Sequence, residues 1–172
     1  MKQQPKKSRL SAARKEKNQS DSKIDSSVVS MSYKELKDKH RQEVNGFPMF
    51  FAFCSEQFAT VMAKFGLTPS DTDKVMRLDY SGGLVLKTDA PRLLNMWNRQ
   101  KEECRAAITA DTKGDGYIYQ MFLYELDNHE YGYTGELTDA LAVCDLTMED
   151  VLESKPLLAG LKMAIEEIRN RP

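Results

Sequence analysis

The residues best suited to do chemistry lie in one short stretch of the sequence, residues 122–135. Glu125 and His129 stand four residues apart there, so they share one face if the stretch is helical. A carboxylate beside an imidazole is typical of a general base or of a metal pair. Tyr133 follows closely and could complete such a centre. The candidate catalytic residues are therefore His129, Glu125 and Tyr133.

The same residues also suit an ordinary helix end. A histidine in the last turn of a helix is stabilised in its charged form by the helix dipole and by a paired carboxylate. The zinc-protease motif His-Glu-x-x-His is absent around His129, and the only other histidine is His40. We therefore expect no metal and no cofactor, and we favour a helix cap over a catalytic centre.

A binding surface is a further reading of this stretch. Tyrosine is a frequent anchor in protein interfaces, because its rigid ring buries area while its hydroxyl stays hydrogen-bonded. Three tyrosines lie between residues 122 and 135, together with polar neighbours. The candidate binding residues are Asn128, His129, Glu130, Tyr131 and Tyr133.

The chain has electrically opposite ends. Residues 1–30 carry eight Lys and Arg against three Asp and Glu, whereas residues 106–172 carry five against thirteen. Residues 1–30 also have too few large apolar groups to offset the entropy of ordering, which predicts a flexible tail. Such a tail could bind the phosphates of RNA, although a solvated leader without that role is an equal alternative. The candidate nucleic-acid-binding residues are Lys6, Lys7, Arg9, Arg14, Lys15 and Lys17.

Length and composition favour one globular domain over residues 31–172. Of the 172 residues, 41% are hydrophobic and 30% are charged, as in globular rather than disordered or membrane proteins. No apolar run approaches the ~20 residues of a membrane helix. The three cysteines are far apart and form no Cys-x-x-Cys pair. A reducing compartment fits them best, so we expect a cytoplasmic protein.

Apolar periodicity predicts an α+β fold that is mainly helical, with a small antiparallel sheet. Capping signals at Ser32, Thr147 and Ser154 mark three helix starts. A hairpin is expected at the Gly-Gly pair, and the aromatic run before residue 54 is expected to be a buried strand. The predicted helices are 33–45, 55–64, 88–109, 117–128, 138–143, 146–152 and 154–169. The predicted strands are 47–53, 75–80 and 84–87.

Two further patterns carry less weight. Residues 111–122 resemble half of a calcium-binding loop, but Lys113 and Phe122 occupy positions that need oxygen ligands, so we expect an ordinary turn. Residues 140–151 have the rhythm of a helix-turn-helix. Glu149 and Asp150 would face phosphate there and repel it, so we interpret the rhythm as helical packing.

Several motifs are distinctive as a set: Phe-Pro-Met-Phe-Phe-Ala-Phe at 47–53, Lys-Thr-Asp-Ala-Pro at 87–91, Gly-Asp-Gly-Tyr-Ile-Tyr at 114–119 and Asn-His-Glu-Tyr-x-Tyr-Thr-Gly at 128–135. Together they resemble a family of small uncharacterised proteins of Gram-positive bacteria, their phages and conjugative elements. The resemblance covers about residues 32–168 and omits the tail. That family has no established activity, so no catalytic residue carries over.

The resemblance implies an accessory protein of a mobile genetic element. By analogy with other such proteins, we expect a non-enzymatic inhibitor, an anti-CRISPR protein whose partner is a Cas9-type nuclease with its guide RNA. The acidic half could occupy a basic nucleic-acid channel while the tail touches RNA. The alternative is a nuclease or RNA-processing enzyme that uses His129 and Glu125. A DNA-binding regulator is the third reading.

Overall fold

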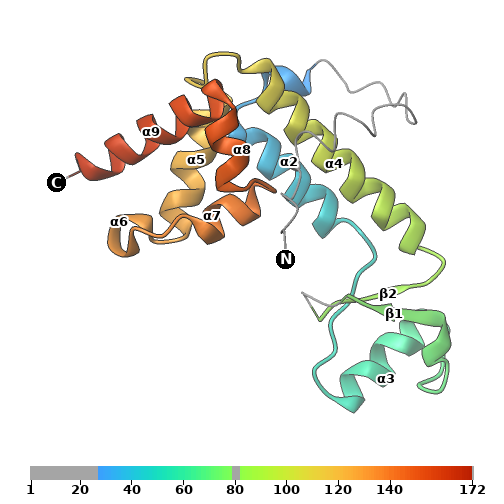
Figure 1. Ribbon diagram of the computed structural model, residues 1–172. Helices are drawn as coiled ribbons and strands as arrows, with labels where there is room; N and C mark the ends of the chain where they lie inside the picture. The colour runs from blue at the N-terminus through green and yellow to red at the C-terminus, as the bar shows by residue number, and fades with distance from the viewer. Residues whose placement is uncertain (1–26, 79–81, 172) are drawn as a thin grey trace, which may run out of the picture. The chain divides into compact units, whose positions relative to one another are not determined.

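The computed structural model describes residues 27–78 and 82–171. As predicted, the fold is mainly helical with a small antiparallel sheet (Figure 1). No helix among these residues is both long and apolar enough to cross a membrane. The elements are η1 (Val28–Ser30), α2 (Tyr33–Asn45), α3 (Ser55–Lys64), η2 (Thr72–Lys74), β1 (Val75–Arg77), β2 (Leu84–Leu86), α4 (Ala90–Ala110), α5 (Tyr117–Asn128), α6 (Tyr131–Thr134), α7 (Thr138–Val143), α8 (Met148–Glu153) and α9 (Lys155–Arg169).

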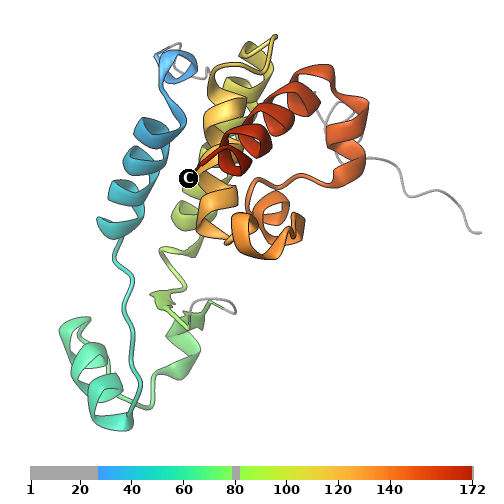
Figure 2. The ribbon, with the colours of Figure 1, turned by 90° about the vertical axis from the view of Figure 1, so that its left-hand side faces the viewer.

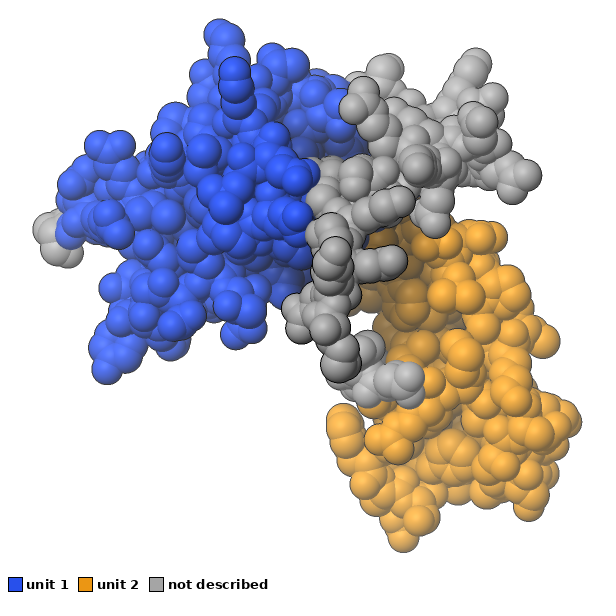
Figure 3. Space-filling model, viewed as in Figure 1, with its two compact units in different colours: residues 1–38, 102–172 blue, residues 39–101 orange. Residues whose placement is uncertain are grey.

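The chain divides into two compact units, which Figure 3 colours separately. Unit 1 comprises residues 1–38 and 102–172, and unit 2 comprises residues 39–101. The division falls inside α2 and inside α4, so each of these helices contributes to both units. Each unit has an apolar cluster of its own.

Unit 1 is built around α5, whose most extensive packing is with α9 (Figure 1, Figure 2). Glycine makes this contact close. A Cβ atom on Gly160 would lie 2.6 Å from Ile118 Cγ2 and 2.7 Å from the Gly114 carbonyl oxygen. Gly114 has a φ of +81°, and its own Cβ would lie 2.0 Å from the Pro156 carbonyl oxygen. The crossing of α5 and α9 therefore has no room for a side chain at either glycine.

Local hydrogen bonds explain where the helices of unit 1 begin. Thr147 and Asp150 form the predicted capping box at the start of α8, and the Ser154 hydroxyl accepts the Leu157 amide of α9. The Asp111 carboxylate accepts the backbone N–H groups of Gly114, Gly116 and Ile118 at 2.8–3.1 Å. Both of its oxygens thus hold the turn that leads into α5, in line with the turn expected there.

Unit 2 contains the two-stranded sheet. β1 and β2 pair antiparallel, with Val75 opposite Leu86 and Arg77 opposite Leu84. Phe50, Met62 and Val75 form the buried cluster of this unit, and the Phe50 and Phe65 rings lie 5.1 Å apart. One face of the sheet therefore packs on α3.

Two sequence-based boundaries need correction. Residues 47–53 do not form the predicted buried strand, because only Phe50 bridges to Leu84 and the side chains of Phe51 and Phe53 are exposed. An apolar run signals burial of a whole strand, but here only one of the four phenylalanine rings is buried. The predicted tail, residues 1–30, lies outside the described residues as far as residue 26. Val28 is 1% exposed in the core of unit 1, so packing starts earlier than expected.

The close crossing of α5 and α9 predicts that Gly160→Ala destabilises the protein. The added methyl group must push the two helices apart, which costs about 1–3 kcal/mol in a packed core. Urea unfolding followed by circular dichroism measures this change in the free energy of unfolding. Gly46→Ala is the control, because its Cβ would lie 3.4 Å from the nearest atom, and we expect a change within about 0.5 kcal/mol. Equal effects of the two substitutions would contradict the packing argument.

Candidate functional site

Glu125 lies on α5 and is 1% exposed, which is unusual for a carboxylate. Its Oε1 atom accepts a hydrogen bond from the Tyr33 hydroxyl and forms an ion pair with Lys37 Nζ. Both partners come from α2. The carboxylate is therefore compensated inside unit 1 by one neutral and one charged donor.

Aromatic rings surround the ammonium group of Lys37. Its Nζ atom lies 4.5 Å from the centre of the Tyr124 ring and 5.4 Å from that of Tyr33. The Tyr33 ring also makes edge contacts with Tyr117 and Tyr124, at centroid distances of 5.5 and 5.6 Å. Cation–π attraction adds to the ion pair with Glu125. We call Tyr33, Lys37, Tyr124, Glu125 and His129 the Glu125 cluster.

His129 occupies the C-cap of α5, and its backbone N–H donates to the Glu125 carbonyl at 3.0 Å. Its Nε2 atom lies 3.8 Å from Glu125 Oε2, beyond hydrogen-bonding distance but close enough for attraction when the ring is protonated. The His129 side chain is 29% exposed, whereas that of Glu125 is 2% exposed. The structure thus brings the predicted pair together, with the imidazole towards solvent and the carboxylate inside.

Hydroxyl and thiol groups with raised pKa values lie in and next to the Glu125 cluster. Burial, followed by the negative charge of Glu125, raises the pKa of Cys144 from 9.0 to about 12. Burial and the hydrogen bond to Glu125 raise the pKa of Tyr33. The Tyr117 hydroxyl is buried and has no hydrogen bond of good geometry to any described residue, and burial followed by the neighbouring Cys104 raises its pKa. All three groups are therefore held in their neutral forms.

The Glu125 carboxylate is not open to solvent as a general base would need to be in this structure. A general base must reach a substrate within hydrogen-bonding distance, but Glu125 is enclosed and its Oε1 atom already has two donors. The two surface hollows described below include no residue of the cluster. Across residues 27–78 and 82–171, no group of three His, Cys, Asp or Glu side chains is placed to hold a metal ion.

Tyr133, the third candidate catalytic residue, lies elsewhere. It is 93% exposed on α6 and lines a hollow of about 580 Å³, which we call the Tyr133 hollow. Arg169 and Arg171 line the same hollow from the end of the chain's last helix, and no lining residue is acidic. Arg169 has no ion-pair partner among the described residues. The lining residues are Tyr131, Gly132, Tyr133, Thr134, Gly135, Ile168, Arg169 and Arg171.

The backbone before α6 separates the two tyrosines of the motif. Glu130 has a left-handed conformation, with a φ of 54°, and starts the single turn of α6. Tyr131 then points into the core, with 8% exposure, while Tyr133 points outward. Asn128 and Glu130 are exposed, outside the lining of the hollow. Of the five predicted binding residues, only Tyr131 and Tyr133 therefore meet in the hollow.

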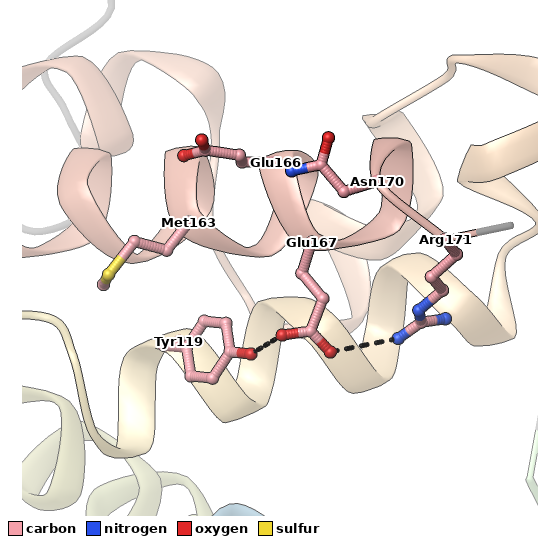
Figure 4. A pocket seen from close by; sticks show the side chains of 6 residues that line it. All are labelled: Tyr119, Met163, Glu166, Glu167, Asn170 and Arg171. Carbon is pink, nitrogen blue, oxygen red and sulfur yellow. Dashed lines mark hydrogen bonds and ion pairs between the residues drawn. The ribbon is translucent and has the colours of Figure 1, made fainter.

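A second hollow, of about 490 Å³, lies between α5 and α9 (Figure 4). Its polar groups bind one another. The Tyr119 hydroxyl donates to Glu167, and Arg171 lies 3.6 Å from the same carboxylate and 2.8 Å from Asp127. The side chain of Glu167 is thus held from both sides, as Figure 4 shows. Arg171 belongs to both hollows and is fixed at their boundary.

The comparison with known families matches residues 32–167 to a family of unknown function (DUF7659). The chain belongs to the DUF7659 family. No curated protein and no solved structure matches the chain. The sequence resemblance to an uncharacterised family is confirmed at this level.

Sequence reasoning missed several residues of these sites in the DUF7659 chain, and Tyr33, Lys37, Arg169 and Arg171 are the main ones. Tyr33 and Lys37 stand four apart on one face of α2, and a lysine on an apolar stripe was the available signal. Arg169 and Arg171 gave no such signal, because charged residues at a helix end usually only complement the dipole. The predicted nucleic-acid-binding residues, Lys6 to Lys17, lie outside the described residues.

The ion pair of the Glu125 cluster predicts a large effect of Lys37→Met. The substitution leaves a buried carboxylate without its cation, and we expect a loss of about 2–3 kcal/mol. This is less than the 3–5 kcal/mol of a fully buried pair, because the Lys37 side chain is 36% exposed. Urea unfolding gives the value. In the control, Arg171→Met breaks the exposed pair with Asp127 and should cost less than about 1 kcal/mol. A neutral Lys37→Met variant would contradict the role of the pair.

The raised pKa of Cys144 predicts that stability falls in alkali. Above pH 9 the unfolded chain releases the thiol proton, while the folded chain keeps it until about pH 12. The unfolded state then binds fewer protons, so the free energy of unfolding decreases as pH rises through this window. Urea unfolding between pH 8 and pH 10.5 measures the slope. We expect Cys144→Ala to reduce this slope, with the remainder due to Tyr33 and Tyr117, and Cys54→Ala, at an exposed thiol, to have a smaller effect. Equal slopes in the wild type and Cys144→Ala would be the contrary result.

Proposed function

We propose that this protein acts by binding another macromolecule and catalyses no reaction, and that the Tyr133 hollow is part of its binding surface. The observation that carries this proposal is the contrast between two sites. The Glu125 carboxylate is enclosed in its cluster, whereas Tyr133 is 93% exposed in a hollow that Arg169 and Arg171 also line. Tyrosine and arginine are the residue types most enriched among interface hot spots.

The net negative charge of unit 1 supports a partner with a basic surface. The described residues of unit 1 carry eight Lys and Arg against seventeen Asp and Glu. A positively charged partner would be attracted to this unit and would associate faster at low salt. Arg169 would then bind an acidic group within that mostly basic surface, while Arg171 stays paired with Asp127.

The narrower proposal is an anti-CRISPR protein of a mobile element of Gram-positive bacteria, acting in the cytoplasm. Its partner would be a Cas9-type nuclease with its guide RNA. Such a nuclease holds its RNA–DNA duplex in a positively charged channel, which the acidic unit 1 could occupy. Support for this step comes from charge complementarity and from the analogy with other mobile-element proteins.

Substitutions in the Tyr133 hollow test the binding surface. We expect Tyr133→Ala and Arg169→Ala each to weaken binding to the purified nuclease–guide RNA complex about tenfold or more, equivalent to about 1.4 kcal/mol. Surface plasmon resonance measures the affinity, and cleavage of target DNA measures inhibition. Lys162→Ala is the matched control for Arg169→Ala, because Lys162 is exposed on α9, as Arg169 is, but does not line the hollow.

Three outcomes would separate the readings. Unchanged DNA cleavage at excess protein would end the Cas9 proposal, and unchanged affinity of Tyr133→Ala would remove the hollow from the interface. Shortened guide RNA after incubation with magnesium would favour the enzyme alternative, which is supported by the 3.8 Å approach of His129 to Glu125. In that case His129→Ala should abolish the cleavage.

A further inference from the structure

Among the described residues, the segment between α2 and α3, residues 46–54, forms backbone hydrogen bonds with the sheet only at Phe50. The Phe50 N–H donates to the Leu84 carbonyl at 3.0 Å, and the Leu84 N–H donates to the Phe50 carbonyl at 2.8 Å. Both backbone groups of Phe50 therefore face β2. In an extended segment the groups of the next residue face the opposite side.

The backbone of Phe51 is open on that opposite side. No described residue forms a hydrogen bond with its N–H or its carbonyl group. Its neighbours on the same outer side are already partly engaged, since the Met49 N–H donates to Phe47 at 2.7 Å and the Phe53 N–H donates to Gln57 Oε1 at 2.8 Å. The open part of the edge is thus short and centred on Phe51.

Aromatic side chains flank this open edge. Phe53 is 86% exposed and Phe51 is 46% exposed, whereas Phe50 is buried against Phe65. Natural sheets usually protect an exposed edge with lysine, another charge or a bulge. Residues 47–54 contain no charged residue. The edge therefore combines unpaired backbone groups with apolar surface, the two features that an added strand uses.

We propose that this edge binds an extended, neutral or acidic segment of a protein partner, which adds to unit 2 as a short β-strand opposite Phe51. The backbone of the partner segment pairs with the Phe51 N–H and carbonyl groups, and its side chains pack on Phe51 and Phe53. Residues 39–101 carry nine Lys and Arg against six Asp and Glu, which favours an acidic segment. The site is independent of the Tyr133 hollow.

Other occupants fit less well. A single nucleic-acid strand could stack on the rings, but it would leave the Phe51 backbone unpaired, and such strands are usually bound where basic residues alternate with the aromatics. A second copy of the chain would bring two positively charged units together. An extended polypeptide fits best, because its backbone can form hydrogen bonds with both the N–H and the carbonyl group of Phe51.

The test is a selection of random heptapeptides displayed on phage against the full-length protein, followed by synthesis of the enriched peptides. We expect binders to lose at least tenfold in affinity on Phe53→Ala and to be unaffected by Leu94→Ala. Leu94 is 51% exposed in the same unit, which makes it the matched control. N-methylation of the peptide residue that pairs with Phe51 should abolish binding, and N-methylation of the residues beside it should not. Hydrogen exchange of the Phe51 amide should slow when the peptide is added.

The proposal would be overturned if the selection enriched no peptide, or if the binders kept their affinity for the Phe53→Ala variant. It would also be overturned if N-methylation had the same effect at every position, because the peptide would then bind through its side chains alone. Sedimentation velocity adds one more. A concentration-dependent dimer of the full chain that Phe53→Ala abolishes would identify a second copy as the occupant.

Discussion

The arrangement of unit 1 depends on one carboxylate that is kept away from water. Moving an ionised Glu125 into the interior costs several kcal/mol, which only close donors can offset. The Tyr33 hydroxyl and the Lys37 ammonium group supply that compensation, and both belong to α2. We infer that this pair favours one register of α2 against α5, even where it adds little net stability. His129 and the turn into α6 follow directly from this anchored end of α5.

The interior and the surface of the protein differ in chemistry. In the interior, the charge of Glu125 is paired, whereas aromatic and charged side chains are exposed at the surface. Burial keeps the hydroxyl and thiol groups around Glu125 in their neutral forms, so these side chains pack in the interior without adding charge. The surface differs, with an exposed tyrosine and two arginines lining one hollow in unit 1 and exposed phenylalanines in unit 2. The two proposed surfaces differ in chemistry, which would let one protein bind two parts of a large assembly.

Local signals made the helices predictable. Apolar residues at helical spacing, the capping box at Thr147 and the serine before α9 act within a few residues, so the sequence contains them in full. Long-range contacts carry no such signal. Tyr33 and Lys37 lie 92 and 88 residues from Glu125, and nothing in a single sequence links them. The run at residues 47–53 was misjudged because hydrophobicity does not distinguish a buried strand from an exposed aromatic edge.

The meeting of Gly114 and Gly160 links distant parts of unit 1. These two glycines set how closely α9 can lie against the first turn of α5. Glu125 follows two turns later on the same rigid helix, so the spacing at the glycines also sets how deep the carboxylate lies. Relatives that carry a bulkier residue at either glycine would need a shifted α5, and with it a different partner for the acid. The close backbone contact at these glycines and the donors on α2 therefore have to match each other.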